Sequence, residues 1–165
     1  MSDTKANLQE AFAGESQANR KYLAFAKKAE QDGFPIVARL FRAASEAETI
    51  HALAHLANMD GIGSTADNLK AAFEGETYEA HHMYPPMVAQ AQAENHRAKR
   101  MFEMAGKAEA VHAKLYAMAL QAVKTGKDIS ADAFYLCPTC GNVEMGAAPA
   151  TCPICGTKGD RFQKM

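Results

Sequence analysis

Acidic side chains interrupt the apolar stripes of four helix-forming segments, and this feature restricts the possible fold more than any other. The interruptions are Glu15, Glu48-x-x-His51, Glu76-x-x-Glu79 and Glu109-x-x-His112. Residues three or four apart share one face of a helix, so each acid lies in line with the apolar residues of its segment. One buried carboxylate is costly, and five would repel one another unless cations lay between them. The pattern predicts a helix bundle with metal ions in its core.

Apolar periodicity and helix-breaking residues divide the first part of the chain into four helices. We expect them over about residues 4–31, 35–59, 65–91 and 93–124. Ser64 and Asp67 have the spacing of a capping box, and Tyr84-Pro85-Pro86 should bend or break the third helix. The longest connection, about residues 60–75 and partly helical, would be a crossover between two antiparallel pairs. The predicted fold is an all-α four-helix bundle with one long crossover.

Four cysteines in two tight pairs lie near the end of the chain. They are Cys137, Cys140, Cys152 and Cys155, in the pattern C-x₂-C-x₁₁-C-x₂-C. Four thiolates in a tetrahedron suit either zinc or a single iron, and the pattern alone leaves both open. Apolar residues are scarce after Lys127, so this segment needs a metal staple to fold. We expect domains over residues 1–130 and 131–165, the second a small metal-stapled domain of strands and loops.

The carboxylates and histidines of the four helices match a known two-metal pattern. A single Glu-x-x-His is usually accidental, but two on separate helices, with carboxylates on the other two helices, are not easily dismissed. One Glu from each of two helices and Glu-x-x-His from each of the others is the ligand set of di-iron and di-manganese bundles. Oxygen-rich ligands with one imidazole per ion suit iron or manganese better than structural zinc.

These motifs resemble those of the rubrerythrins over essentially the whole chain. The first 125 or so residues resemble the ferritin-like domain of that family, and the cysteine segment resembles its rubredoxin-like domain. The resemblance implies that Glu48 and Glu109 bridge two irons, that His112 holds one of them, and that Glu15 and Glu76 are terminal ligands. It also implies that Glu79 and His51 are alternative ligands of one iron. Matching tyrosines, Tyr22 and Tyr84, would hydrogen-bond the carboxylates, with core packing as the alternative.

The resemblance also implies an activity, cofactors and partners. The chain would be a non-haem iron peroxidase that reduces hydrogen peroxide to water, with two Fe ions in the helical site and one Fe in the Cys₄ site, where Zn is a possible substitute. Electrons would come from a rubredoxin or an NAD(P)H-dependent reductase. A head-to-tail homodimer would bring one subunit's tail to the other's di-iron centre, because within one chain the tail could lie far from the site.

Two other function classes remain open from the sequence. One is a ferroxidase that oxidises and deposits iron, although ferritin-type sites lack the extra ligand that Glu79 represents. The other is a peroxide sensor whose zinc tail docks a partner. The net charge of −1 gives no argument for nucleic acid or an anionic membrane as a partner, and no apolar run approaches a membrane span. The paired cysteines and the absence of a signal-peptide pattern lead us to expect a cytoplasmic location.

Overall fold

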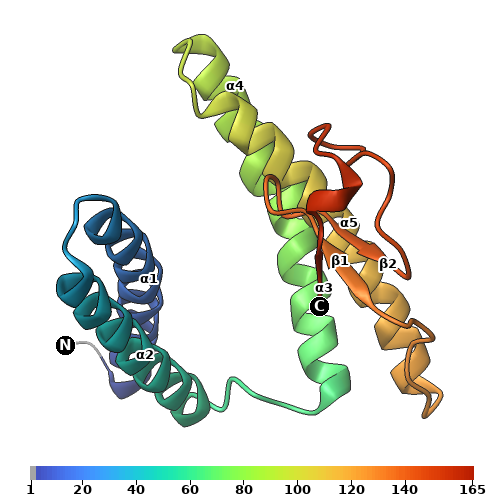
Figure 1. Ribbon diagram of the computed structural model, residues 1–165. Helices are drawn as coiled ribbons and strands as arrows, with labels where there is room; N and C mark the ends of the chain where they lie inside the picture. Colours follow the sequence, from blue (N-terminus) through green and yellow to red (C-terminus); the bar gives the residue numbers. More distant parts are fainter. Residues whose placement is uncertain (1–2) are drawn as a thin grey trace. The chain divides into compact units, whose positions relative to one another are not determined.

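The computed structural model describes residues 3–165, which form two compact units that divide between Gly63 and Ser64. The first unit is a hairpin of two long helices, α1 (Thr4–Gln31) and α2 (Pro35–Asn58), which lie side by side in Figure 1. The side chain of Asp3 caps α1 by accepting from the amide of Ala6. Pro35 starts α2 at a position that needs no amide hydrogen. The two predicted helices are confirmed, with the second ending one residue early.

The second unit begins with a long helical segment whose middle turn is π-helical and not α-helical. Helix α3 (Thr65–Tyr78) is followed by a π-helical turn, η1 (Glu79–Met83), and by α4 (Tyr84–Ala93). Ser64 and Asp67 form the predicted capping box. Pro85 lies just beyond η1 and has no amide hydrogen, and the Tyr84 amide donates to the carbonyl of Glu79, five residues back. The predicted bend near Pro85 is therefore a π-helical turn, and it begins at Glu79.

Helix α5 (Lys99–Lys124) packs along α3, η1 and α4 (Figure 1). The sequence prediction that this helix starts at about residue 93 was wrong, because a turn occupies residues 94–98. In that turn Asn95 has a positive φ of 49°, and the His96 amide donates to the carbonyl of Ala91. Such a bond closes the end of α4, so the chain reverses there before α5 begins.

The cysteine-bearing tail belongs to the second unit. Its strands β1 (Phe134–Leu136), β2 (Val143–Met145) and β3 (Gln163–Lys164) form an antiparallel sheet in the order β2-β1-β3, and η2 (Gly159–Arg161) is a single 3₁₀ turn. Three buried thiols form its core, and Met104 of α5 packs against them. A core made of thiols is consistent with the prediction that this segment needs a metal staple. Within residues 3–165, no helix is both long enough and apolar enough to cross a membrane.

Candidate metal centres

The first unit brings together three of the predicted ligands. One donor atom each from Glu15 on α1 and from Glu48 and His51 on α2 lie within 4.8 Å of one another. His51 Nδ1 lies 3.0 Å from a carboxylate oxygen of Glu48. A hydrogen bond with Glu48 raises the pKa of Glu15, and burial and the charge of Glu48 raise it further. The same hydrogen bond lowers the pKa of Glu48. The two acids therefore need a shared proton or a cation between them.

A buried polar cluster one turn away fixes the two helices that carry these ligands. Asn19 of α1 donates through Nδ2 to the carbonyl oxygen of Ser45 at 2.8 Å and to the Thr49 hydroxyl at 2.7 Å. Asn19 and Ser45 are both buried, and the Ser45 hydroxyl donates back to the Asn19 carbonyl. Sequence reasoning missed these residues. The signal was present, since Asn19 follows Glu15 by four positions and Ser45 precedes Glu48 by three.

The second unit contains a closely similar group of three. One donor atom each from Glu76 on α3 and from Glu109 and His112 on α5 lie within 4.8 Å of one another. His112 Nδ1 is 2.8 Å from Glu109 and 3.7 Å from Glu76. Burial raises the pKa of Glu76, and its hydrogen bond with Glu109 and the charge of Glu109 raise it further. This pair too needs a proton or a cation between its oxygens.

Glu79 and Tyr84 flank the second group at the two ends of the π-helical turn. Glu79 is half-buried and lies outside the group within 4.8 Å. Desolvation raises the pKa of the Tyr84 phenol, and the nearby charges of Glu109, Glu79 and Glu76 raise it further, so its proton is held firmly. Gly106 of α5 permits this placement, because a Cβ there would lie 3.0 Å from Tyr84 Cβ. Tyr84 is thus a proton-bearing group beside three carboxylates.

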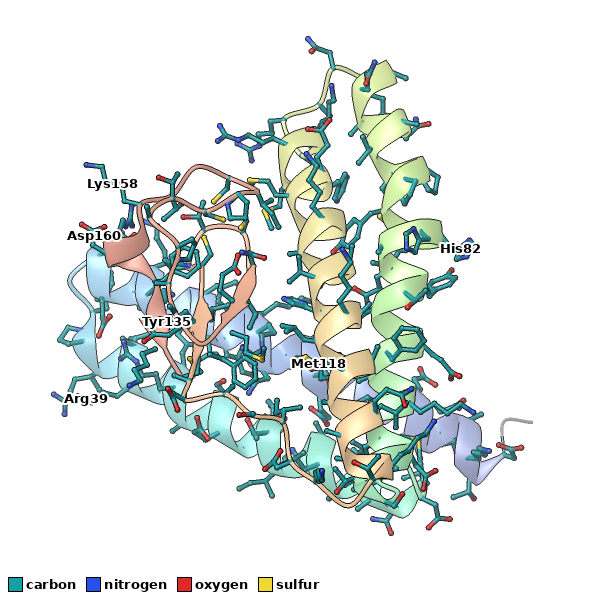
Figure 2. The ribbon with its side chains drawn as sticks, turned by 90° about the vertical axis from the view of Figure 1, so that its right-hand side faces the viewer. Arg39, His82, Met118, Tyr135, Lys158 and Asp160 are labelled. Carbon is teal, nitrogen blue, oxygen red and sulfur yellow. The ribbon has the colours of Figure 1, made fainter. Side chains whose placement is uncertain are left out.

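Tyr22, the other predicted tyrosine, and His82 both lie in aromatic contacts. Tyr22 packs against Phe25 and Phe41, with ring centroids 6.3 Å and 6.1 Å apart, which matches the core-packing alternative. His82 is exposed and points away from α5 (Figure 2). It stacks on Tyr78 of the same helix.

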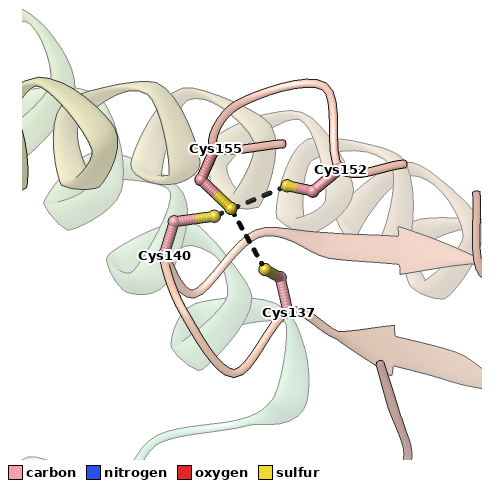
Figure 3. Close-up of side chains that lie close together, drawn as sticks. All are labelled: Cys137, Cys140, Cys152 and Cys155. Atoms are coloured by element: carbon pink, nitrogen blue, oxygen red, sulfur yellow. Dashed lines mark hydrogen bonds between the residues drawn. The ribbon is translucent and has the colours of Figure 1, made fainter. Parts of the chain in front are cut away.

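The four cysteines converge on one point from two similar loops (Figure 3). Cys137 Sγ lies 3.5 Å from Cys155 Sγ, and Cys140 Sγ lies 3.6 Å from Cys152 Sγ. A tetrahedral ion with metal–sulfur bonds of about 2.3 Å needs sulfurs about 3.8 Å apart, so the spacing fits a metal and excludes disulfides. Gly141 and Gly156, with φ of 82° and 80°, allow each loop to turn directly after its second cysteine.

A hydrogen bond joins this cysteine site to the helical ligands of the same unit. His112 Nε2 lies 2.9 Å from the carbonyl oxygen of Gly141, the residue after Cys140. A carbonyl only accepts, so Nε2 carries a proton, and Nδ1 faces Glu109 and Glu76, where it would bind an iron held between them. The expectation that the tail could lie far from the helical ligands of its own chain was wrong, because it contacts one of them directly.

The donor groups fit iron in the two helical groups and in the Cys₄ site. Two carboxylates and one imidazole in each helical group provide the hard oxygen donors and single nitrogen that iron accepts. Four thiolates in tetrahedral positions suit one iron or zinc. The fold and these donors define a di-iron carboxylate protein with an attached Cys₄ metal domain.

Comparison with known proteins agrees with this class. The family model described as rubrerythrin matches residues 6–120, and that of the rubrerythrin rubredoxin-like domain matches residues 135–163. Rubrerythrin-2 of Clostridium acetobutylicum is 37% identical, covering 94% of this chain and 93% of its own. Nigerythrin of Nitratidesulfovibrio vulgaris is 38% identical, covering 96% and 85%. The solved structure of fully reduced, all-ferrous nigerythrin matches with a TM-score of 0.58 at 35% identity, covering 100% of this chain and 88% of that one.

The chain belongs to the rubrerythrin family. Its predicted fold class is thereby confirmed, a ferritin-like four-helix bundle with a small rubredoxin-like domain. The predicted cofactors are confirmed as well, a carboxylate and histidine di-iron site and a four-cysteine iron site. Membership supports an oxidoreductase role of the peroxidase type.

Proposed function

We propose that this protein reduces hydrogen peroxide to water, taking electrons through its Cys₄ centre. The observation that carries the proposal is the hydrogen bond from His112 to the Gly141 carbonyl. The path from the Cys140 sulfur to the His112 ring runs through the covalent bonds of Cys140 and Gly141 and crosses only this one hydrogen bond. A protein that only stored iron would have no use for a one-electron carrier joined to its metal ligands. The peroxidase is therefore favoured over the ferroxidase and over a zinc-tailed peroxide sensor.

Peroxide reduction consumes two electrons and two protons for each pair of water molecules formed. Bound iron supplies the electrons and the Lewis acidity that weakens the O–O bond. The protein must hold protons close to that bond, and three groups are suited to this task. The raised pKa of the Tyr84 phenol keeps a proton there beside the ligand groups, and Glu15 or Glu76 could take up a proton when its carboxylate leaves the iron. Each of them is a candidate general acid.

We assign the helical ligands as the family resemblance implies. Glu48 and Glu109 would bridge the irons, with Glu15, Glu76 and His112 as terminal ligands, while Glu79 and His51 bind one iron alternately. An anionic oxygen favours the ferric ion, and a neutral imidazole suits the ferrous one. The position of Glu79 at the start of the π-helical turn supports a functional role for this residue, because single π-helical turns inside α-helices occur frequently at functional sites.

The remaining parts of the proposal concern electron supply and cellular context. A rubredoxin or an NAD(P)H-dependent reductase would reduce the Cys₄ iron, and the protein would act as a homodimer in the cytoplasm during oxidative stress. We also propose a functional boundary near residue 130, between the helical ligands and the electron-carrying tail. The link between them, residues 125–133, contains no helix or strand.

The test is Glu79→Ala, with Glu74→Ala as its matched control on the same helix. Glu74 is 61% exposed and pairs with Lys70, so its removal should leave peroxide turnover unchanged. Glu79→Ala should keep its iron but lose most of its NADH-coupled peroxide turnover. A Glu79→Ala protein with the full wild-type rate would overturn the assignment of Glu79. Stopped-flow mixing of the reduced protein with peroxide and with oxygen separates the activities, because a ferroxidase would react faster with oxygen and accumulate ferric iron.

A further inference from the structure

We propose that the peptide group between Gly141 and Asn142 couples the Cys₄ centre to the helical ligand group, so that a metal ion on His112 raises the reduction potential of the Cys₄ iron. Such coupling is reciprocal, so reduction of the Cys₄ iron would tighten metal binding at His112 by the same factor. Asn142 is the positioning residue that holds this peptide. The proposal rests on the two metal sites of the second unit and not on peroxide turnover.

The two polar groups of this one peptide face different metal ligands. Its carbonyl oxygen, on Gly141, accepts from His112 Nε2 at 2.9 Å. Its amide, on Asn142, donates to the sulfur of Cys140; burial raises the pKa of that thiol, and this hydrogen bond opposes the increase. The carbonyl and the amide of a peptide share electrons by resonance, so a stronger hydrogen bond at one end strengthens the bond at the other. Two hydrogen bonds through one peptide therefore join His112 to Cys140.

The direction of the effect follows from the charges at the two ends of this path. A cation bound at His112 Nδ1 withdraws electrons from the ring and makes Nε2–H a stronger donor to the Gly141 carbonyl. The Asn142 amide then becomes a stronger donor to the Cys140 thiolate. Reduction adds one negative charge to the Cys₄ centre, and hydrogen bonds to its sulfurs stabilise the more negative state. A metal on His112 should therefore make the Cys₄ iron easier to reduce.

The second cysteine loop shows which part of this arrangement is common to both loops. In each loop the first cysteine donates its amide to a carbonyl five residues on, Cys137 to Asn142 at 2.8 Å and Cys152 to Thr157 at 2.7 Å. The amide of Thr157 also donates to the sulfur of Cys155. These shared bonds close each loop around the metal. The bond from a helical metal ligand is added to this pattern at the first loop, so it is not a requirement of folding the loop.

Asn142 has the features of a residue that holds this peptide in place. Its side chain is fully buried, and its Nδ2 donates to a carboxylate oxygen of Glu144 at 2.8 Å. Its Oδ1 is buried without a hydrogen-bond partner among residues 3–165. An unsatisfied buried carbonyl is costly, so an apolar residue of similar size would be more stable at a position used only for packing. The bond to Glu144 instead ties the residue that carries the bridging amide to strand β2.

The first measurement is a redox titration of protein that holds iron in its Cys₄ site, with the helical ligands either metal-free or loaded with Zn²⁺. Zinc has no redox chemistry of its own, so the titration follows the Cys₄ iron alone. We expect loading to raise the reduction equilibrium constant by about fivefold to tenfold, at the lower end of the range for coupled sites. This is a potential about 40–59 mV more positive. An unchanged or more negative potential would overturn the proposal.

A matched pair of variants separates the peptide bridge from the charge of the helical metal acting through space. Glu144→Gln and Glu144→Ala both remove the carboxylate charge, but only glutamine keeps an oxygen that can accept from Asn142 Nδ2. Glu144 is half-buried, so its truncation disturbs the fold less than truncation of the fully buried Asn142 would. We expect Glu144→Gln to keep most of the zinc-induced shift and Glu144→Ala to lose at least half of it. Equal shifts in the two variants would show coupling through space and would overturn the bridge.

Zinc affinity provides a second test, because the coupling is reciprocal. Calorimetric titration of Zn²⁺ into the helical ligands should give about fivefold to tenfold tighter binding when the Cys₄ iron is reduced than when it is oxidised. The Glu144→Ala variant should lose most of this preference. Equal affinities in the two oxidation states of the wild-type protein would refute the proposal. Neither test uses peroxide, so a protein that shows the coupling but does not reduce peroxide would refute only the proposed function.

Discussion

The hydroxyl of Thr157 should raise the reduction potential of the Cys₄ iron. Thr157 Oγ1 lies 3.1 Å from Cys155 Sγ, and it donates to Thr139 Oγ1 at 2.9 Å. When the Cys155 thiolate binds iron it can only accept, so the Thr157 proton turns to sulfur and the Thr139 hydroxyl donates to Thr157. Burial opposes ionisation of Cys155, yet the Thr157 hydroxyl and the backbone lower its pKa to about 6. The same bond stabilises the more negative, reduced centre.

The size of the effect follows from the strength of a charge-assisted hydrogen bond. Such bonds contribute about 1.5–3 kcal/mol. Both oxidation states of the centre are anionic, so we assign about a third to a half of that energy to the difference between them, roughly 0.5–1.5 kcal/mol. For a one-electron couple a tenfold change in equilibrium constant, about 1.4 kcal/mol, is 59 mV. Thr157→Val should therefore lower the potential by roughly 20–65 mV.

The assay is a redox titration of the visible absorption of the Cys₄ iron. Thr157→Ser keeps the hydroxyl and should titrate close to wild type, and Thr139→Val, which leaves the bond to sulfur, should shift the potential less than Thr157→Val. An unchanged or more positive potential in Thr157→Val would refute the reasoning. Because Val matches Thr in shape, a lowered potential would not be due to a cavity.

Three further perturbations test the packing around the sites. Asn19→Ala leaves buried partners on Ser45 and Thr49 unsatisfied and should cost about 1–3 kcal/mol, measured by denaturant unfolding; an unchanged midpoint would mean that the cluster is not stabilising. Gly106→Ala should cost about 1–3 kcal/mol, because its Cβ crowds Tyr84, whereas Gly75→Ala, whose Cβ meets nothing within 4 Å, should be neutral or stabilising; equal effects would argue against crowding. Removing the tail metal should make residues 131–165 protease-sensitive while helical circular dichroism persists, since the tail's core is made of its thiols; a protected apo tail would contradict this.

Helix boundaries were predictable where the sequence carries its own stop signals. Asp32-Gly33 and Pro35 fixed the first hairpin to within a residue, and Ser64 with Asp67 fixed the start of α3. The start of α5 was not predictable, because the turn at residues 94–98 lacks glycine and proline. Asn95 adopts the left-handed conformation there, which asparagine tolerates, but an asparagine in the sequence does not by itself indicate a turn. The π-helical turn was foreseen only as a bend, since proline shows that helix geometry must change but not how.

The candidate site was likewise predictable within single helices but not across contacts between distant segments. Helical spacing placed Glu48 with His51 and Glu109 with His112 on single faces, because side chains within one helix follow from its period alone. The contact between His112 and Gly141 joins residues far apart in the sequence, and no local pattern encodes such a distance. The hydroxyls of Ser45, Thr49 and Thr157 were missed for a related reason. Their short spacing from the predicted ligands was visible in the sequence, but spacing alone does not show which partner a hydroxyl meets across a turn or on a second helix.

The tail contact indicates where electrons would enter the helical ligands under the proposed function. The tail bonds to His112 of its own second unit, so the Cys₄ centre of a chain would pass its electrons to the ligand group of Glu76, Glu109 and His112 in the same chain. Electron delivery would then need no second chain. In a mixed dimer that lacks the tail on one chain, we therefore expect half of the peroxide turnover of the intact dimer; complete loss of turnover would contradict this route.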